Sequence, residues 1–267
     1  MYKAGFVGGG NMARAIIAGI VGSGMVPPGE IIVSDASAPA LNALSEKFGV
    51  ATARCNRETA KQAELVVLAV KPQFYAKVID EIKDDVLADE QKIVVTLAPG
   101  WTLERIEAAF GRPLKIVRTM PNTPALVGEG VTAVCKGGLV EPDEMKHVTA
   151  LLGSFGRVHA LPENLIDVFA ALCGSSPAYV FMMVEAMADA AVREGMPRAM
   201  SYTLAAQALM GSAKMLAELG QHPGALKDMV CSPGGSTIEG VRALEERGMR
   251  SAFFDAIASA VAKNRII

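Results

Sequence analysis

Six short apolar runs alternate with helix-type segments over the first 120 residues, and this alternation limits the fold more than any other feature. The runs are AGFV (4–7), EIIVSD (30–35), VATA (50–53), ELVVLAV (64–70), KIVVTL (92–97) and LKIVRTM (114–120). Strands that are apolar throughout are typical of a sheet covered on both faces. Strand and helix in alternation predict an α/β fold with a doubly wound parallel sheet.

After about residue 162 the alternation stops and helical patterns take over. We predict helices near 163–173, 177–194, 198–219, 224–231, 236–247 and 249–264. A chain of 267 residues is long enough for two domains. We therefore predict a dinucleotide-type α/β domain over 1–161 and an all-α domain over 162–267.

A glycine-rich turn follows the first predicted strand. Gly8, Gly10 and Ala13 form G-x-G-x-x-A between that strand and the helix after it. Small residues there allow a sharp turn, the approach of a pyrophosphate to backbone amides, and close helix packing. The context favours a Rossmann-type dinucleotide site, and a tight packing turn is the alternative.

Asp35 ends the second predicted strand, where it bears on which dinucleotide binds. A carboxylate there accepts hydrogen bonds from a ribose diol, which suits NAD, and repels the 2′-phosphate of NADP. Neighbouring polar and basic residues could favour NADP instead: Ser34, Ser37, Arg54, Asn56 and Arg57. A role for Asp35 in capping the next helix beside Ser37 is a third interpretation.

Three later strands end in AVKP (69–72), LAPG (97–100) and MPNTPA (120–125). Ligands of open parallel sheets lie outside the carboxyl ends of the strands, so these segments would converge on one crevice. Lys71 could face the cofactor there, and a solvated lysine is the alternative.

Composition narrows the function further. The formal charge of −2 offers no basic field for nucleic acid, and the three histidines are too scattered for a metal cluster. Four scattered cysteines indicate reduced thiols in a cytoplasmic protein. The apolar N-terminal stretch is interrupted by Asn11 and Arg14, so we expect neither a signal peptide nor a membrane span.

The helical half is apolar on most faces. Between 177 and 219 the polar residues form narrow stripes, among them Glu185, Asp189 and Arg193. Helices of this kind must be buried, so a partner chain is expected, with burial against the first domain as the alternative.

The segment CSPGGSTIEG (231–240) places a glycine turn before a helix. Ser236 and Glu239 have the spacing of a capping box, so the helix is predicted to begin at about Ser236. Gly234 and Gly235 would let a small anion reach the free amides of that helix. An ordinary helix cap is the alternative. GSSP (174–177) offers a similar start, with Ser176 as the cap.

The sequence lacks a plausible catalytic base of the usual kinds. No Ser-His-Asp set, HExxH or paired-carboxylate motif is evident. Reduction of an imine needs little proton machinery, because protonation of the nitrogen already makes the carbon electrophilic. A hydroxy-acid dehydrogenase with Lys214 as base, or a non-catalytic dinucleotide sensor, are the alternatives.

Long motifs then resemble one family. VGGGNM, AVKP, MPNTPALVGEG, GSSPAYVF, GMPR, QALMGSAKM and HPGALKDMVCSPGGSTIEGV look like the pyrroline-5-carboxylate reductases over nearly the whole chain. The resemblance implies NAD(P)H-dependent reduction of 1-pyrroline-5-carboxylate to L-proline, the last step of proline biosynthesis. It implies a Rossmann domain followed by a helical dimerisation and substrate domain, in a homodimer or a decamer. NADPH is the expected cofactor, with NADH as the alternative.

The resemblance also implies roles for residues at matching positions. The pyrophosphate would be held by Gly8, Gly10, Asn11 and Met12, and the adenosine side by Ser34 and Asn56. The nicotinamide side would be lined by Ala69, Val70, Lys71, Pro72, Ala98, Pro99 and Gly100. The substrate carboxylate would be bound by the loop that includes Ser232, Gly234, Gly235, Ser236 and Thr237. The Thr237 hydroxyl would point at the ring nitrogen, and Glu163 matches a position near the substrate.

Three positions depart from the family pattern. Cys173 stands where Ser or Thr is usual before GSSP, and LAPG replaces the common AAG. Asp35 is unusual in a group that mostly prefers NADPH, which leaves the cofactor preference open.

Overall fold

A computed structural model describes residues 1–266 and divides the chain into two compact units. The first comprises Met1–Gly174 and the end of the chain from Val261, and the second is Ser175–Ala260. The predicted boundary at 161/162 therefore lies within the first unit as contacts define it, and it stays a prediction.

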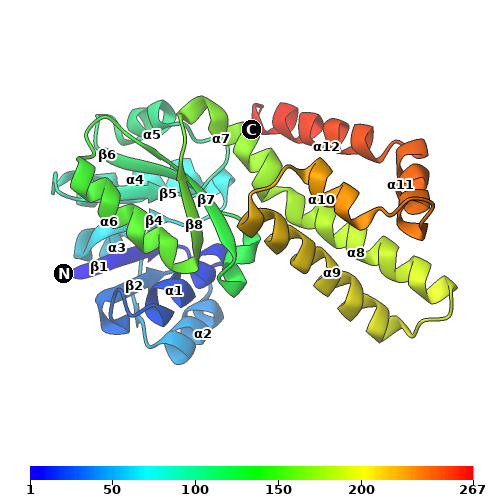
Figure 1. Cartoon of the computed structure of the whole chain (residues 1–267). Coiled ribbons are helices and arrows are strands. Elements are labelled where there is room, and N and C mark those ends of the chain that lie inside the picture. The colour runs from blue at the N-terminus through cyan, green and yellow to red at the C-terminus, as the bar shows by residue number, and fades with distance from the viewer. Residues whose placement is uncertain (267) are drawn as a thin grey trace. The chain divides into compact units, whose positions relative to one another are not determined.

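The first unit contains one eight-stranded sheet (Figure 1). Its strands are β1 (Tyr2–Val7), β2 (Ile31–Ser34), β3 (Ala51–Thr52), β4 (Ala63–Leu68), β5 (Ile93–Thr96), β6 (Lys115–Met120), β7 (Gly130–Lys136) and β8 (Gly156–Ala160). The order is β3-β2-β1-β4-β5-β6-β7-β8, so strand order reverses direction between β1 and β4. All pairings are parallel except β6 with β7. The doubly wound fold is confirmed, with one antiparallel pairing that the sequence did not predict.

Helices separate most of these strands. The α-helices of the first unit are α1 (Asn11–Gly22), α2 (Ala38–Phe48), α3 (Asn56–Gln62), α4 (Tyr75–Leu87), α5 (Leu103–Phe110), α6 (Pro142–Leu152) and α7 (Ile166–Phe169). Short 3₁₀ turns are η1 (Pro28–Glu30), η2 (Pro72–Phe74), η3 (Thr123–Val127), η4 (Gly153–Phe155) and η5 (Glu163–Leu165), and η6 (Ala170–Gly174) is a π-helical turn.

Local signals explain where α2 and α5 begin and end. The Ser37 hydroxyl accepts a hydrogen bond from the Ala40 amide, and Gly49 closes α2 in the left-handed conformation. Thr102 and Gly111 do the same for α5. Ser and Thr are favoured at helix N-termini because the side-chain oxygen satisfies a free amide. Gly is favoured at helix C-termini because it adopts positive φ without strain.

The sheet is buried on both faces by two apolar clusters. Leu65 and Val67 of β4 belong to the cluster that includes α1, whereas Val66 and Leu68 belong to the cluster that includes α4. Alternate residues of a strand point to opposite faces, so an uninterrupted apolar run is needed to fill both layers.

The second unit is built of helices alone. They are α8 (Ser176–Arg193), α9 (Arg198–Leu219), α10 (Pro223–Val230), α11 (Ser236–Glu246) and α12 (Met249–Asn264), whose end belongs to the first unit. Helices α8 and α9 pack against each other. In Ser175–Ala260, which the structure describes throughout, Ala188, Ser201 and Ala205 are the only buried residues.

Large apolar side chains of this unit are exposed. They include Phe181, Met182, Leu204, Met210, Met229, Val230 and Phe254. A helical unit that buries three small residues has no apolar core of its own. By length and composition 163–193 could span a membrane, which is weak evidence, because apolar helices of soluble proteins meet the same criterion.

Candidate active site and cofactor cleft

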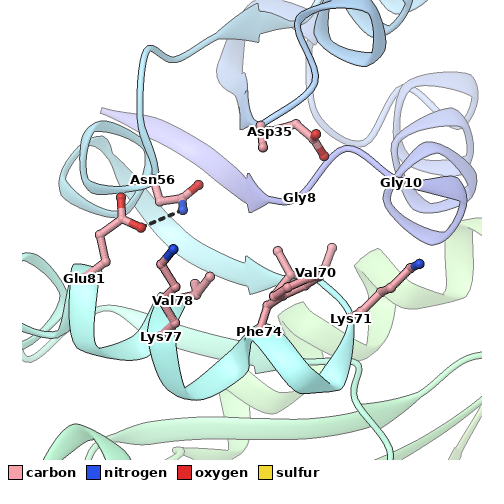
Figure 2. A pocket seen from close by; sticks show the side chains of 12 residues that line it. Gly8, Gly10, Asp35, Asn56, Val70, Lys71, Phe74, Lys77, Val78 and Glu81 are labelled. Atoms are coloured by element: carbon pink, nitrogen blue, oxygen red, sulfur yellow. Dashed lines mark hydrogen bonds between the residues drawn. The ribbon is translucent and has the colours of Figure 1, made fainter.

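A cavity of about 480 Å³ opens at the carboxyl ends of β1, β2 and β4 in the first unit. It is lined by Gly8, Gly10, Asp35, Ala36, Asn56, Ala69, Val70, Lys71, Phe74, Lys77, Val78 and Glu81 (Figure 2). This is the point where strand order reverses, the place at which open α/β sheets bind ligands.

The first glycine of the turn is required by the chain itself. Gly8 has a φ of +105°, and a Cβ there would lie 2.8 Å from the backbone carbonyl carbon of Ala69. Its amide donates a hydrogen bond of 2.8 Å to the carbonyl of Ser34. Gly8 therefore bonds the end of β1 to the end of β2 and lets the backbone after β4 approach closely at the edge of the cavity.

Gly10 differs from Gly8 because nothing in the protein requires it. Its φ is −70°, and no heavy atom lies within 4 Å of the position that a Cβ would take. Gly10 caps α1, and no side chain satisfies the first amides of that helix. Free amides, the positive end of a helix dipole and open space over Gly10 together fit the pyrophosphate of a dinucleotide.

Asn11 and Met12 follow at the start of α1, but neither lines the cavity. Asn11 is exposed, and Met12 packs against the apolar cluster of that face. Contact of Asn11 and Met12 with a dinucleotide stays a prediction, and the backbone of these residues would make it.

Asp35 fastens the glycine turn to the next helix. One carboxylate oxygen, Oδ2, accepts the Gly9 amide at 2.6 Å, and Oδ1 accepts the Ser37 amide at 2.7 Å. The capping interpretation is wrong, because Ser37 caps α2; Asp35 instead orders the segment before that helix. The same carboxylate lines the cavity (Figure 2).

Ser34 and Asn56 form a hydrogen-bonded chain at one end of the cavity. The Ser34 hydroxyl donates to Asn56 Oδ1 at 2.9 Å, and Asn56 Nδ2 donates to Glu81 Oε2 at 2.9 Å. Ser34 is 1% exposed and does not line the cavity, whereas Asn56 does. The structure thus places Ser34 as a support for Asn56.

The segment after β4 contributes Ala69, Val70 and Lys71 to the cavity, but the other predicted residues of that side lie outside its lining. These are Pro72, which begins η2, and Ala98, Pro99 and Gly100, which follow β5.

Tyr75 ties these two segments together. Its hydroxyl donates to the Leu68 carbonyl at 2.6 Å and accepts the Leu97 amide at 3.0 Å. Burial raises the pKa of Tyr75 to about 12, so the hydroxyl keeps its proton at neutral pH. Trp101 adds a second link, because its indole N–H donates to the Pro72 carbonyl at 3.2 Å.

Five residues of the lining were missed by the sequence analysis. Ala36 follows Asp35, and the other four are Phe74, Lys77, Val78 and Glu81 around the start of α4. Residues three and four positions apart lie on one helix face. The spacing of Phe74, Lys77, Val78 and Glu81 after AVKP was therefore a sequence signal that could have identified these residues.

Glu163 is held by the first unit. Its Oε1 accepts Arg118 Nη1 at 2.9 Å and the Leu103 amide at 2.7 Å. Asp167 lies 3.6 Å from Arg118 Nη2, and Arg118 is almost fully buried. Contact of Glu163 with a substrate stays a prediction.

The glycine turn of the second unit begins α11, as predicted. Gly234 has a φ of +69°, and a Cβ on Gly235 would collide with the Ser232 hydroxyl. Ser232, Ser236 and Thr237 are exposed. The expected capping box is wrong, because Gly235 is the N-cap and no side chain caps the helix. The Glu239 carboxylate pairs instead with Arg242 at 3.0 Å.

The other expected helix start is also different. Helix α8 has Ser175 as N-cap and no side-chain cap, and it follows the π-helical turn η6 directly. Ser176 is thus not the cap.

No alternative catalytic group emerges from the geometry. Lys214 is exposed and lies 3.7 Å from Glu218, as a solvated lysine would. Among residues 1–266, no group of three or more His, Cys, Asp or Glu side chains could hold a metal ion.

Comparison with known proteins finds family models that match both parts of the chain. Residues 163–267 match the family model described as pyrroline-5-carboxylate reductase dimerisation. Residues 3–100 match the model described as NADP oxidoreductase coenzyme F420-dependent.

Full-length relatives are also found. The chain is 48% identical to pyrroline-5-carboxylate reductase of Escherichia coli over 98% of this chain and 97% of that protein. The solved structure of a pyrroline-5-carboxylate reductase from Coxiella burnetii is 37% identical and superposes with a TM-score of 0.91, over 99% of this chain and 97% of that one. A Plasmodium falciparum pyrroline carboxylate reductase, solved with NADP bound, is 30% identical with a TM-score of 0.90, over 99% and 97% of the two chains. This chain belongs to the pyrroline-5-carboxylate reductase family.

Proposed function

We propose that this protein reduces 1-pyrroline-5-carboxylate to L-proline with NADPH, the last step of proline biosynthesis. The observation that carries the proposal is the open cavity over Gly10 at the strand-order reversal, in a chain whose full length matches this family. NADPH, when bound, supplies the hydride that reduces the carbon of the C=N bond.

The cofactor would be held by the first unit. The amides at the start of α1 would bind the pyrophosphate beside Gly8 and Gly10, and Asn56 would support the adenosine end. Ala69, Val70 and Lys71 would lie along the nicotinamide half, with Pro72 and Ala98–Gly100 as a supporting layer fixed by Tyr75. Asn11, Met12, Ser34 and Asp35 complete the proposed set.

The substrate would be held by the loop Ser232–Thr237. Its exposed hydroxyls and the uncapped amides of α11 suit a small carboxylate, because neither is used by a cap within the helix. Glu163 is proposed as a further substrate residue. Positioning, with a polar partner for the nitrogen, is the chemistry that this set can provide.

The direct test is oxidation of NADPH in the presence of 1-pyrroline-5-carboxylate. We expect loss of NADPH absorbance that depends on this substrate, with L-proline as the product by chromatography. Turnover of a 2-hydroxy acid with NAD and none of the imine would favour the hydroxy-acid dehydrogenase. Dinucleotide binding without turnover of either substrate would favour the non-catalytic dinucleotide sensor.

The Thr237 hydroxyl is proposed as the partner of the ring nitrogen. Loss of one hydrogen bond to a charged group costs about 1.5–3 kcal/mol. Thr237→Ala should therefore lower turnover about tenfold to a hundredfold. NADPH affinity, measured by calorimetry on the same variant, should be unchanged.

Ser236→Ala is the companion variant. Because the Ser236 hydroxyl forms no cap, thermal stability should change by less than about 0.5 kcal/mol. If Ser236→Ala abolishes turnover and Thr237→Ala keeps it, the two hydroxyls have each other's roles. Full turnover of both variants would remove the loop from the active site.

We also propose that the second unit forms a homodimer, with a decamer as the larger alternative. Its exposed Met, Leu and Phe side chains would then be covered by another copy of the chain. Light scattering at micromolar concentration should give at least twice the 28.0 kDa of one chain. A soluble particle of one chain's mass would contradict this proposal.

The remaining proposals concern the cellular location of the protein, its partners and its domain boundaries. We propose a cytoplasmic enzyme without nucleic-acid or membrane partners, in keeping with four free cysteines and near-neutral charge. Cell fractionation with antibody detection would test this. We keep 1–161 and 162–267 as the functional domains.

A further inference from the structure

The cavity has a charge pattern that bears on the choice between NADPH and NADH. Its ionisable lining consists of two carboxylates, Asp35 and Glu81, and two lysines, Lys71 and Lys77. Figure 2 shows Lys71 at one end and Lys77 at the other, on the same side as Asn56 and Glu81. Near Asn56 the cavity therefore has one carboxylate, Glu81, and one lysine, Lys77 (Figure 2).

The basic residues expected to favour NADP lie outside the lining of this cavity. Arg57 pairs with Asp85 at 2.6 Å and Arg54 pairs with Glu58 at 3.3 Å, and neither arginine lines this cavity. Ser34 is buried and donates to Asn56.

Lys77 is uncommitted by contrast. It is exposed, and within residues 1–266 its ammonium has no hydrogen bond or ion pair. The nearby Glu81 carboxylate accepts the Asn56 amide at 2.9 Å. An ammonium without a partner beside a cavity is available to an anionic ligand, since lysine binds phosphate as a mobile point charge.

We propose that Lys77 determines the dinucleotide preference of this enzyme, by binding the 2′-phosphate that distinguishes NADPH from NADH. The proposal rests on the proposed function for the identity of the cofactor. Lys77 acts against Asp35, whose carboxylate is fixed on the cavity wall by the amides of Gly9 and Ser37. The preference follows from the balance between this fixed negative charge and the mobile positive one.

Lys77 is also a better probe than Asp35. Replacing Asp35 would release the Gly9 and Ser37 amides, so the glycine turn would change along with the charge. Replacing Lys77 breaks no hydrogen bond or ion pair among the described residues, so a change in affinity would report on the ligand.

The experiment compares Lys77→Met and Lys77→Glu with Lys83→Met. Lys83 lies on the same helix, pairs with Asp80 at 2.7 Å and is outside the cavity, so its variant is the matched control. Calorimetry gives the affinity of each for NADPH and NADH. The fragments adenosine 2′,5′-bisphosphate and AMP differ by the 2′-phosphate, so comparing their affinities measures the contribution of that phosphate.

We expect Lys77→Met to weaken NADPH and the bisphosphate about tenfold to a hundredfold, the loss expected for one charge-assisted contact. NADH and AMP should bind as before. Lys77→Glu should weaken NADPH further and make NADH the tighter ligand, and Lys83→Met should match the parent.

Equal losses for NADPH and NADH, or no loss for either, would overturn the assignment of Lys77. These affinities are measured in the absence of 1-pyrroline-5-carboxylate, so they do not depend on the proposed reaction. A protein that shows the Lys77 effect but does not reduce 1-pyrroline-5-carboxylate would refute the proposed function and leave this inference intact.

Discussion

Gly10→Val is expected to weaken NADPH binding by at least about a hundredfold while the protein keeps its fold. The φ of −70° suits any L-residue, and no heavy atom lies within 4 Å of the new Cβ, so the free protein has no backbone strain or Cβ clash at this position. The branched side chain would instead fill the space through which a pyrophosphate reaches the amides of α1.

Two further glycine variants make this result specific. Gly29→Val adds the same atoms where nothing lies within 4 Å and outside the cavity, so NADPH affinity should match the parent. Gly8→Ala should instead destabilise the protein, because of the φ of +105° and the Ala69 backbone 2.8 Å from the new Cβ. Calorimetry and thermal melts on all three variants separate ligand exclusion from misfolding. NADPH binding of parental strength in a folded Gly10→Val would show that the pyrophosphate lies elsewhere.

The parallel part of the sheet could be predicted because each strand is apolar and is separated from the next by a recognisable segment. Strands β7 and β8 were missed for a physical reason. The connection from β6 to β7 is the short 3₁₀ turn η3, which allows an antiparallel return but no crossover helix. Edge strand β8 is partly exposed, so it lacks the apolar run that marked the others.

The candidate cofactor site was predictable where it lies at strand ends. Gly8, Asp35 and Lys71 all follow parallel strands, and the carboxyl ends of such strands share one edge of the sheet. The wall from α4 was missed, because Lys77 and Glu81 belong to no motif and reach the cavity only through the packing of that helix.

The error at α11 has a local cause. Ser236 and Glu239 have capping-box spacing, but Gly235 occupies the cap position and shifts both residues one place into the helix. Glu239 then reaches Arg242, three residues later, in place of a backbone amide.

Arg118→Met should have the largest effect on stability. The Arg118 side chain is 3% exposed, and its guanidinium lies 2.9 Å from a Glu163 oxygen and 3.6 Å from an Asp167 oxygen. Removing the cation leaves two carboxylates without their buried partner, which typically costs about 3–5 kcal/mol. Because both carboxylates are about 30% exposed, water offsets part of the loss, and we expect about 3 kcal/mol.

Arg112→Met is the control for a surface arginine, since its partly exposed guanidinium lies 3.8 Å from Glu90 and donates to the Leu87 carbonyl at 2.7 Å. That variant should cost less than about 1 kcal/mol. Thermal melts at one fixed protein concentration are required, because association of the chains raises apparent stability. Equal melting temperatures for Arg118→Met and Arg112→Met would show that the buried pair contributes nothing beyond a surface pair.

A double-mutant cycle with Glu163→Gln tests whether Arg118 acts through Glu163. Glu163 Oε1 also accepts the Leu103 amide, so the ion pair links β6, η5 and the start of α5. If the link is direct, the loss in the double variant should be smaller than the sum of the two single losses, by roughly 1–3 kcal/mol. Additive losses would mean that Arg118 stabilises the protein through Asp167 and packing alone, without coupling to Glu163.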